Sequence, residues 1–138
     1  MARRLLDVLL DNLGDLRAYR ARITREQLHH DRDAQHLVLH ALYLAVQSTI
    51  DLALHVGADA GLAQSATYQD AFRRLGASGL IDPQLAARLT GWAGLRNVLA
   101  HLYPVIDHGR IYDALDELGD LEVFARTVAA MLDSSSAS

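Results

Sequence analysis

Arg96, His101 and Tyr103 lie close together in the sequence, directly before Pro104. Histidine is the side chain best matched to proton transfer near neutral pH. Arginine binds phosphate oxygens through paired N–H donors and stabilises negative charge that develops in a transition state. RNA can be cut without a metal if a base removes the 2′-hydroxyl proton, a cation stabilises the phosphorus centre and an acid protonates the departing 5′-oxygen. The three side chains suit that reaction.

In such a reaction His101 would be the base or the acid, and Arg96 would hold the phosphate. Asn97 lies four residues before His101 and could orient the imidazole or the scissile phosphate. In a straight helix Arg96 and His101 point about 140° apart, too far to converge easily on one phosphate. Either the helix unwinds before Pro104, or two copies of the motif meet across a two-fold axis.

A structural role for the same residues must be weighed against this interpretation. Read as a helix, the segment places five apolar or aromatic side chains on one stripe, with Arg96 in its middle: Leu85, Leu89, Trp92, Leu99 and Tyr103. A buried arginine needs a partner, so Arg96 meets a carboxylate, lines a wet cleft or extends its charged end to solvent. Tyr103 is either exposed at the helix end or part of the core.

The segment Arg96-Asn97-x-x-x-His101-x-Tyr103 resembles the Rx4HxY signature of the HEPN superfamily. Further landmarks resemble its HepT-like branch and extend the resemblance from about residue 5 to residue 130: Asp31-Arg32-Asp33, the run 45–55 and Tyr68-Gln69-Asp70-Ala71-Phe72. The resemblance implies a homodimer whose paired motifs line a shared cleft. It also implies a toxin whose tyrosine, Tyr103 here, is AMPylated by a minimal nucleotidyltransferase antitoxin of the MntA type.

The run 45–55 adds two supporting candidates, Asp51 and His55, which lie within the region of resemblance. Asp51 is a candidate partner for Arg96, and the alternative is a polar stripe satisfied between helices. His36 and His40 have the spacing of a helical metal site, but no third ligand is fixed by spacing. We therefore expect neither a metal nor another cofactor.

Hydrophobic periodicity predicts an all-α, up-and-down bundle of four to five helices that dimerises. The expected helices cover residues 3–23, 31–56, 67–76, 83–103 and 111–132, with a capping box at Thr24–Gln27 and a loop over 57–67. Gly91 and Gly94 inside the fourth helix suggest a close backbone contact there. Residues 1–133 form one domain, and residues 134–138 are expected to be a disordered tail.

Composition limits the possible functions. The chain of 138 residues has a net charge of −4 and no cysteine, which excludes disulfides and thiolate chemistry. Residues 1–25 hold six arginines against three aspartates, so RNA or an acidic partner could approach there, although an ordinary solvated helix face would look the same. The longest apolar run, 37–46, is too short to cross a membrane, and we expect a cytoplasmic protein.

Together the residues and the resemblance predict a metal-independent endoribonuclease toxin that cuts RNA, either tRNA or mRNA. Arg96 and His101 would be catalytic, and Asn97, Asp51 and His55 would support them. An alternative is a non-catalytic HEPN module that keeps the motif as a nucleotide-binding or interaction surface for its nucleotidyltransferase partner. A purely structural helical adaptor is a third possibility.

Overall fold

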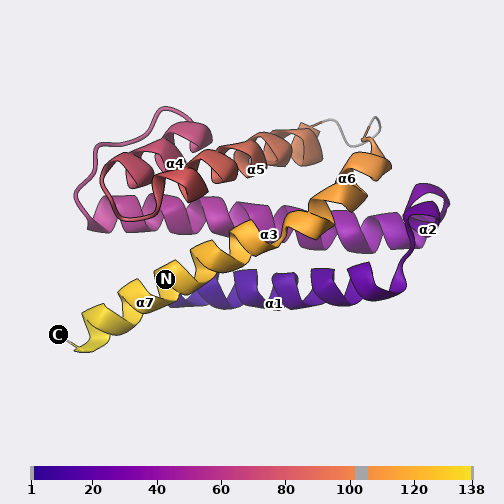
Figure 1. Ribbon diagram of the computed structural model, residues 1–138, viewed down its shortest axis with the longest axis horizontal. Helices are drawn as coiled ribbons and strands as arrows, with labels where there is room; N and C mark the ends of the chain where they lie inside the picture. Colours follow the sequence, from indigo (N-terminus) through magenta and orange to yellow (C-terminus); the bar gives the residue numbers. More distant parts are fainter. Residues whose placement is uncertain (1, 102–105, 138) are drawn as a thin grey trace.

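The helix α3 (Arg32–Asp59) is the element around which the other long helices pack. The computed structural model describes residues 2–101 and 106–137. In Figure 1, α1 (Ala2–Arg22) follows one side of α3, and α4 (Tyr68–Ala77) and α5 (Pro83–His101) follow the other. The last helix, α7 (Gly119–Ala137), crosses this layer obliquely. The prediction of an all-α bundle is therefore confirmed, with five longer helices in the described residues.

Two short helices and one 3₁₀ turn complete the bundle. The helix α2 (Arg25–His30) begins at the predicted capping box, in which Thr24 Oγ1 accepts from the Gln27 amide at 3.0 Å. The helix α6 (His108–Ala114) and the turn η2 (Leu115–Glu117) lead into α7. The sequence predicted one long helix over this region, and this prediction is wrong. The apolar face continues through the break, which falls at η2 and Leu118, directly before α7 begins at Gly119.

The predicted N-terminal caps of α4 and α5 are confirmed. Thr67 Oγ1 accepts from the Asp70 amide at 3.0 Å, and Asp82 Oδ1 accepts from the Gln84 amide at 2.8 Å, beside Pro83. Side-chain oxygens at these positions satisfy amides that the first helical turn leaves without a partner. Both α4 and α5 therefore begin at residues that the sequence specifies locally.

The loop predicted to begin at Gly57 begins later, because α3 continues to Asp59. The helix ends where Gly61 adopts a φ of +78°, which glycine adopts without steric cost. The amide of Leu62 donates to the Gly57 carbonyl at 2.9 Å, and that of Gly61 donates to the Ala58 carbonyl at 3.0 Å. This is the hydrogen-bond pattern of a Schellman motif. At the other end of the chain, α7 continues to Ala137, so residues 134–137 are helical.

The close backbone contact between helices lies at a different glycine from those predicted. A Cβ at Gly91 would meet nothing within 4 Å, and one at Gly94 would meet only the Gln69 side chain at 3.8 Å. At Gly76 in α4, a Cβ would lie 2.7 Å from the Ala86 Cβ in α5. The prediction for Gly91 and Gly94 is wrong, and Gly76 is the residue that lets α4 lie against the helix carrying the motif.

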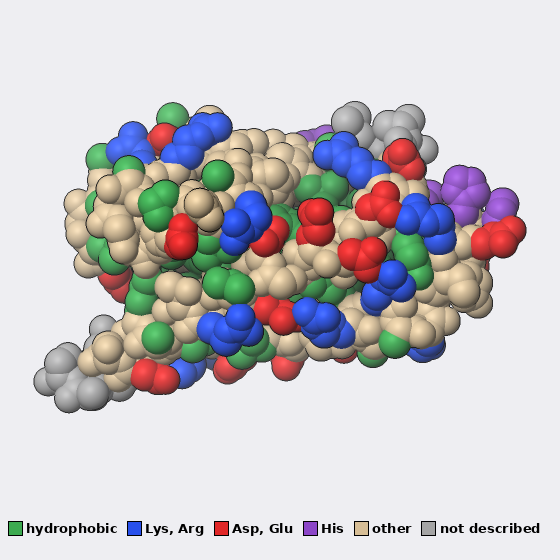
Figure 2. Space-filling view, viewed as in Figure 1, with side chains coloured by type: hydrophobic (Ala, Val, Ile, Leu, Met, Phe, Trp, Pro, Cys, Tyr) green, Lys and Arg blue, Asp and Glu red, His purple; other side chains and the backbone are tan. Residues whose placement is uncertain are grey.

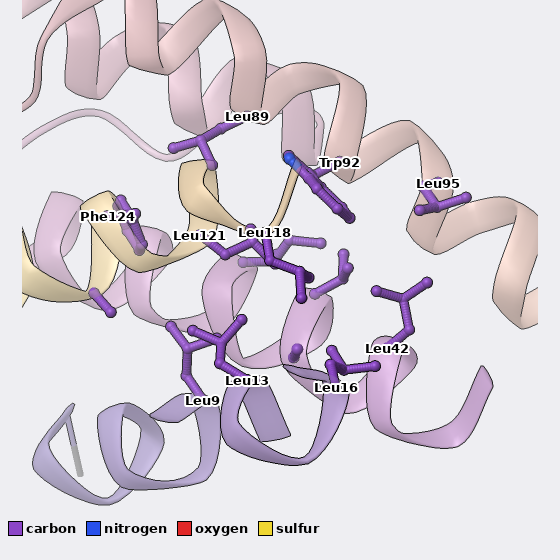
Figure 3. Close-up of a cluster of buried hydrophobic side chains, with 14 of the residues drawn as sticks. Leu9, Leu13, Leu16, Leu42, Leu89, Trp92, Leu95, Leu118, Leu121 and Phe124 are labelled. Atoms are coloured by element: carbon purple, nitrogen blue, oxygen red, sulfur yellow. The ribbon is translucent and has the colours of Figure 1, made fainter. Parts of the chain in front are cut away.

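The core brings together leucines and aromatic residues from the first, third, fifth and last helices. Figure 3 shows leucines of α1 facing Leu42, Trp92 and Phe124 across the bundle. By length and hydropathy alone α3 could cross a membrane, but 61% of its most apolar window is buried. The apolar character of α3 is thus accounted for by its central position.

Candidate functional site

Arg96 lies half-buried on α5, where α3 supplies its main polar partner. Its Nε donates to Gln47 Oε1 at 2.9 Å, and Nη1 donates to the Asn97 side-chain oxygen at 3.3 Å. The Tyr68 ring at the start of α4 faces the guanidinium, whose Cζ lies 5.2 Å from the ring centroid. A cation over an aromatic face is attracted by the ring quadrupole. Three helices therefore hold this one side chain.

The predicted pairing of Arg96 with Asp51 is not what the structure shows. Asp51 accepts a hydrogen bond from Gln47 Nε2 at 3.0 Å, so the Gln47 amide lies between the carboxylate and the arginine. Among the described residues no carboxylate forms an ion pair with Arg96. The charge of Arg96 therefore faces neutral partner atoms, which a sequence argument based on charge pairing could not anticipate.

The remaining predicted site residues that the structure describes are His101, Asn97 and His55. His101 is exposed at the last residue of α5, while Asn97 is exposed and in contact with Arg96. His55 lies further along α3 and pairs with Asp59, with 3.3 Å between Nε2 and Oδ2. Tyr103 and Pro104 lie outside the described residues. The structure thus joins Arg96 to Asp51 through Gln47 and to Asn97 directly, and it leaves His55 with a partner of its own.

Gln47 and Tyr68 are the two contacts that the sequence analysis did not assign to the site. Gln47 stands one helical turn before Asp51 on the same polar stripe of α3, which was a usable signal. Tyr68 follows the Thr67 cap directly, and nothing in its sequence context indicated that its ring would face Arg96. Only the packing of α4 on α5 brings the Tyr68 ring to Arg96.

The histidine pair on α3 lies away from this site. His36 and His40 line a surface hollow of about 650 Å³ together with Asp33 and residues of α1, including Asp15. Within residues 2–101 and 106–137, no three histidine or carboxylate side chains are placed to hold one metal ion. These residues therefore add nothing to the group around Arg96.

Four of the six arginines in residues 1–25 form ion pairs within the fold. Arg3, Arg17 and Arg20 on α1 pair with Asp133, Glu122 and Asp116, and Arg25 on α2 pairs with Asp113. Figure 2 shows basic and acidic side chains interleaved on this face instead of a continuous basic surface. Most of the uneven charge seen in the sequence is thus balanced within the molecule, which weakens the prediction that RNA or an acidic partner could approach this helix.

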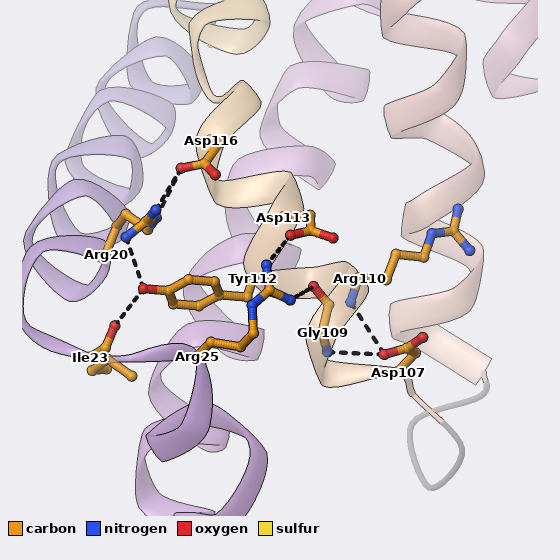
Figure 4. Close-up of polar contacts among 9 residues, drawn as sticks. All are labelled: Arg20, Ile23, Arg25, Asp107, Gly109, Arg110, Tyr112, Asp113 and Asp116. Atoms are coloured by element: carbon orange, nitrogen blue, oxygen red, sulfur yellow. Dashed lines mark hydrogen bonds and ion pairs between the residues drawn. The ribbon is translucent and has the colours of Figure 1, made fainter.

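Tyr112 on α6 is the centre of this junction, as Figure 4 shows. Its hydroxyl accepts from Arg20 Nη1 at 2.8 Å and donates to the Ile23 carbonyl at 3.1 Å. Arg20 and Arg25 both lie against its ring, with Cζ atoms 4.4 and 5.1 Å from the centroid. The hydrogen bond to Asp113 raises the pKa of Arg25. This junction ties the first two helices to the segment that follows the motif.

A histidine cluster lies at the same end of the bundle, between α2 and α6. The rings of His29 and His108 meet edge to face with centroids 6.4 Å apart, and His30 lies 4.9 Å from His29. Burial lowers the pKa of His108, the charge of His29 lowers it further, and Asp107 acts in the opposite direction. Burial and His29 both favour the neutral form of His108.

A surface hollow of about 750 Å³, larger than the one beside His36 and His40, is not the site of Arg96. It lies between α5 and the last helices, beside Trp92. Three of its acidic residues already pair with arginines: Asp113, Asp116 and Asp120. Because acidic residues outnumber Arg88 and Arg110 in its lining, the hollow is a poor receptor for an anion. We therefore place the candidate site at Arg96 on the basis of its chemistry and not of the hollow's size.

Fold and site define an all-helical bundle whose arginine–histidine motif occupies the second half of α5. Residues 9–128 match the family described as "Ribonuclease HepT-like". The chain therefore belongs to the ribonuclease HepT-like family, which confirms the resemblance noted in the sequence.

Individual proteins are similar to this chain over different extents. The chain is 34% identical over 74 residues to a tRNA nuclease HepT of Aphanizomenon flos-aquae, a match that spans only 54% of this chain and 50% of that relative. A tri-AMPylated HEPN toxin of Shewanella oneidensis, solved in complex with its MNT antitoxin, superposes with a TM-score of 0.73 at 24% identity, covering 90% of this chain and 98% of that one.

A second similar structure is that of a protein described as being of unknown function. The cytosolic protein YutE of Bacillus subtilis superposes with a TM-score of 0.81 at 13% identity, covering 96% of this chain and 91% of that one. At such low identities the two structural matches establish the fold alone. They confirm that the helices found here form a recurring arrangement.

Proposed function

We propose that this chain is the toxin of a toxin–antitoxin pair and acts as a metal-independent endoribonuclease on tRNA or mRNA. The observation that carries the proposal is the state of Arg96: half-buried, fixed by Gln47 and Asn97, and without a carboxylate partner among the described residues. An arginine held in this way keeps its charge for an anion. It occupies the arginine position of the motif in a chain of the ribonuclease HepT-like family.

The proposed reaction needs only proton transfer and charge stabilisation. A histidine takes the proton of the 2′-hydroxyl, and the 2′-oxygen attacks phosphorus. The bond to the 5′-oxygen breaks, and that oxygen receives a proton. The products are a 2′,3′-cyclic phosphate and a 5′-hydroxyl. His101, exposed at the end of α5, is the base or the acid, and Arg96 neutralises charge on the phosphate.

A homodimer supplies the second set of groups. One histidine cannot serve as base and acid in the same step, and Arg96 and His101 are five positions apart on one helix. Two motifs that face each other across a two-fold axis would provide two histidines and two arginines around one phosphate. We therefore place the cleavage site in a cleft between two copies. Sedimentation that shows a monomer at micromolar concentration would contradict this arrangement.

We propose further that a small nucleotidyltransferase antitoxin of the MntA type controls the toxin by AMPylating Tyr103. The S. oneidensis toxin with which this chain shares its fold is tri-AMPylated in complex with its antitoxin. Phosphates attached to Tyr103, seven positions after Arg96 in the sequence, would compete with the RNA phosphate for Arg96 and repel the substrate. Both partners would act in the cytoplasm, where RNA and ATP are available.

The first test measures RNA cleavage by the purified protein in excess EDTA. We expect cleavage to fall at least about 100-fold in Arg96→Ala and in His101→Ala, while circular dichroism and sedimentation stay unchanged. Arg88→Ala is the matched control, because Arg88 is on the same helix but pairs with Asp120. The same two variants should relieve growth inhibition. Toxicity that survives both would leave the non-catalytic module as the better explanation.

The second test measures intact mass after incubation with the partner nucleotidyltransferase and ATP. We expect added AMP masses on the wild type and on Tyr43→Phe, and none on Tyr103→Phe. Loss of RNA cleavage should follow the added mass. Unmodified protein in the presence of an active partner would contradict control by AMPylation and favour control by complex formation alone.

A further inference from the structure

The side chain of Gln47 makes two hydrogen bonds that together determine how its amide is oriented. Its Nε2 donates to Asp51 Oδ1 at 3.0 Å, and its Oε1 accepts from Arg96 Nε at 2.9 Å. Asp51 stands four residues later on the same helix, so the two side chains share a face of α3. A carboxylate only accepts hydrogen bonds, which requires the NH₂ group of Gln47 to point towards it. The Gln47 oxygen must then face Arg96.

This orientation limits how Arg96 can bind a ligand. A guanidinium has five N–H donors, and phosphate can use either the Nε edge or the two terminal nitrogens. Gln47 occupies the Nε edge, and one Nη1 donor is directed at Asn97. The Tyr68 ring covers one face of the group. The terminal nitrogens remain the edge at which an incoming phosphate can make paired hydrogen bonds.

The neutrality of Gln47 is as important as its geometry. A glutamate at this position could accept the same bond from Arg96, but it would also cancel most of the local positive charge. Asp51 lies one side chain further away, behind the amide. The amide thus holds the arginine firmly and leaves its charge available. The amide orients Arg96 as carboxylates orient the arginines on α1, but it does not neutralise the charge of the guanidinium.

We propose that Gln47, oriented by Asp51, is the positioning residue that presents the terminal nitrogens of Arg96 to the phosphodiester of the RNA. This inference rests on the proposed function, because it assigns a ligand to Arg96. Gln47 acts through Arg96 and takes no part in bond making. Tyr68 assists by restricting the guanidinium plane.

The experiment measures binding of a short RNA made uncleavable by 2′-deoxy substitution, over a range of salt concentrations. In Gln47→Glu we expect affinity to fall about tenfold and the slope of log K against log salt to fall by about one. A loss of packing alone would not change the salt slope. Gln84→Glu is the matched control, since it adds the same charge at an exposed position on α5.

A second variant covers the case in which the carboxylate introduced by Gln47→Glu repels that of Asp51 enough to disturb folding. Gln47→Met removes the hydrogen bonds without adding charge. We expect kcat on cleavable RNA to fall about tenfold in this variant, with the salt slope unchanged, because Arg96 keeps its charge but loses its fixed orientation. KM should change less than kcat.

The outcomes separate the two proposals. If Arg96→Ala weakens RNA binding while Gln47→Glu keeps the wild-type affinity and salt slope and Gln47→Met keeps the wild-type kcat, the role of Gln47 is refuted and the proposed function stands. If Arg96→Ala itself leaves binding and cleavage unchanged, the proposed function fails and the inference fails with it. Reduced affinity and salt slope in Gln47→Glu, together with reduced kcat in Gln47→Met, would support both.

Discussion

Arginines at two places in this molecule have different kinds of partner. At the junction of α1, α2 and α6, Arg20 and Arg25 pair with the carboxylates of Asp116 and Asp113 and lie on the ring of Tyr112. On α5, Arg96 also lies on a tyrosine ring, but its main partner is an amide. The surroundings are similar except for the charge of the partner.

In the proposed function, this difference lets one residue type serve structure in one place and recognition in another. An arginine paired with a carboxylate has little net charge left for a ligand, and its bonds contribute to holding helices together. An arginine held by an amide is equally well oriented and remains a receptor for an anion. The partner's charge, more than the arginine's burial, distinguishes the two roles.

The largest expected effect comes from replacing one arginine of each kind by alanine and comparing the two variants. Arg96→Ala should lower RNA cleavage at least about 100-fold and leave the free energy of unfolding nearly unchanged. Arg20→Ala should leave cleavage intact and lower the stability towards urea, because Tyr112 loses a hydrogen bond and a cation. Equal effects of both variants on cleavage would show that the distinction between the two groups is false.

The next largest effect concerns the helix that brings Tyr68 to Arg96. Gly76→Ala would place a Cβ 2.7 Å from the Ala86 Cβ. Overpacking of this kind should cost about 1–3 kcal/mol of stability, measured by urea unfolding. Gly91→Ala is the control: it meets open space and should be neutral or stabilising by up to about 1 kcal/mol. A neutral Gly76→Ala would mean that α4 is not fixed tightly against α5.

Tyr112→Phe tests the structural junction alone. The variant removes a buried hydroxyl that bonds both Arg20 and the Ile23 carbonyl. Stability should fall by about 1–2 kcal/mol, as for other buried hydrogen bonds, with no change in RNA cleavage. Tyr43→Phe serves as the control, because no hydrogen bond of its hydroxyl is found among the described residues. A loss of cleavage in Tyr112→Phe would show that the junction affects the candidate site and is not purely structural.

The smallest predicted effect is a dependence of stability on pH at the same junction. The pKa of His108 is lowered by burial and by His29, so the unfolded chain takes up a proton before the folded one does. The contribution of His108 is therefore complete above the usual histidine pKa of about 6.5 and decreases as the pH falls through it. His108→Gln should remove this part of the dependence in thermal unfolding at pH 7 and pH 5. An unchanged dependence would assign it to other groups.

Much of the fold could be predicted because its signals are local. Thr24, Thr67 and Asp82 each specify a helix start through a side chain two or three residues from its target. The end of α3 was misplaced because Gly57 and Gly61 look alike in sequence, and only the second has a positive φ. The split of the last helix went unnoticed because the apolar period continues across it.

The candidate site could be predicted only in part. The motif identified Arg96 and Asn97, but opposite charges suggested Asp51 as the partner of Arg96, whereas an amide lies between them. That arrangement depends on the relative rotation of α3 and α5, which periodicity does not determine. Likewise, the arginines of α1 were candidates for binding until their carboxylate partners, about a hundred residues away in sequence, became visible.

The contacts of α1 and α2 with α6, η2 and α7 join segments that are made at different times during synthesis. Arg25 and Asp113 are 88 positions apart, and Arg3 and Asp133 are 130 apart. The ribosome therefore completes the segment bearing Arg96 before it has made the carboxylates and leucines that close the bundle over α1. Contacts so distant in sequence form late, since the intervening chain must first be ordered. A nascent chain that has reached His101 has therefore already made α3 and α4, which hold Arg96, but it still lacks α7, which packs against α1.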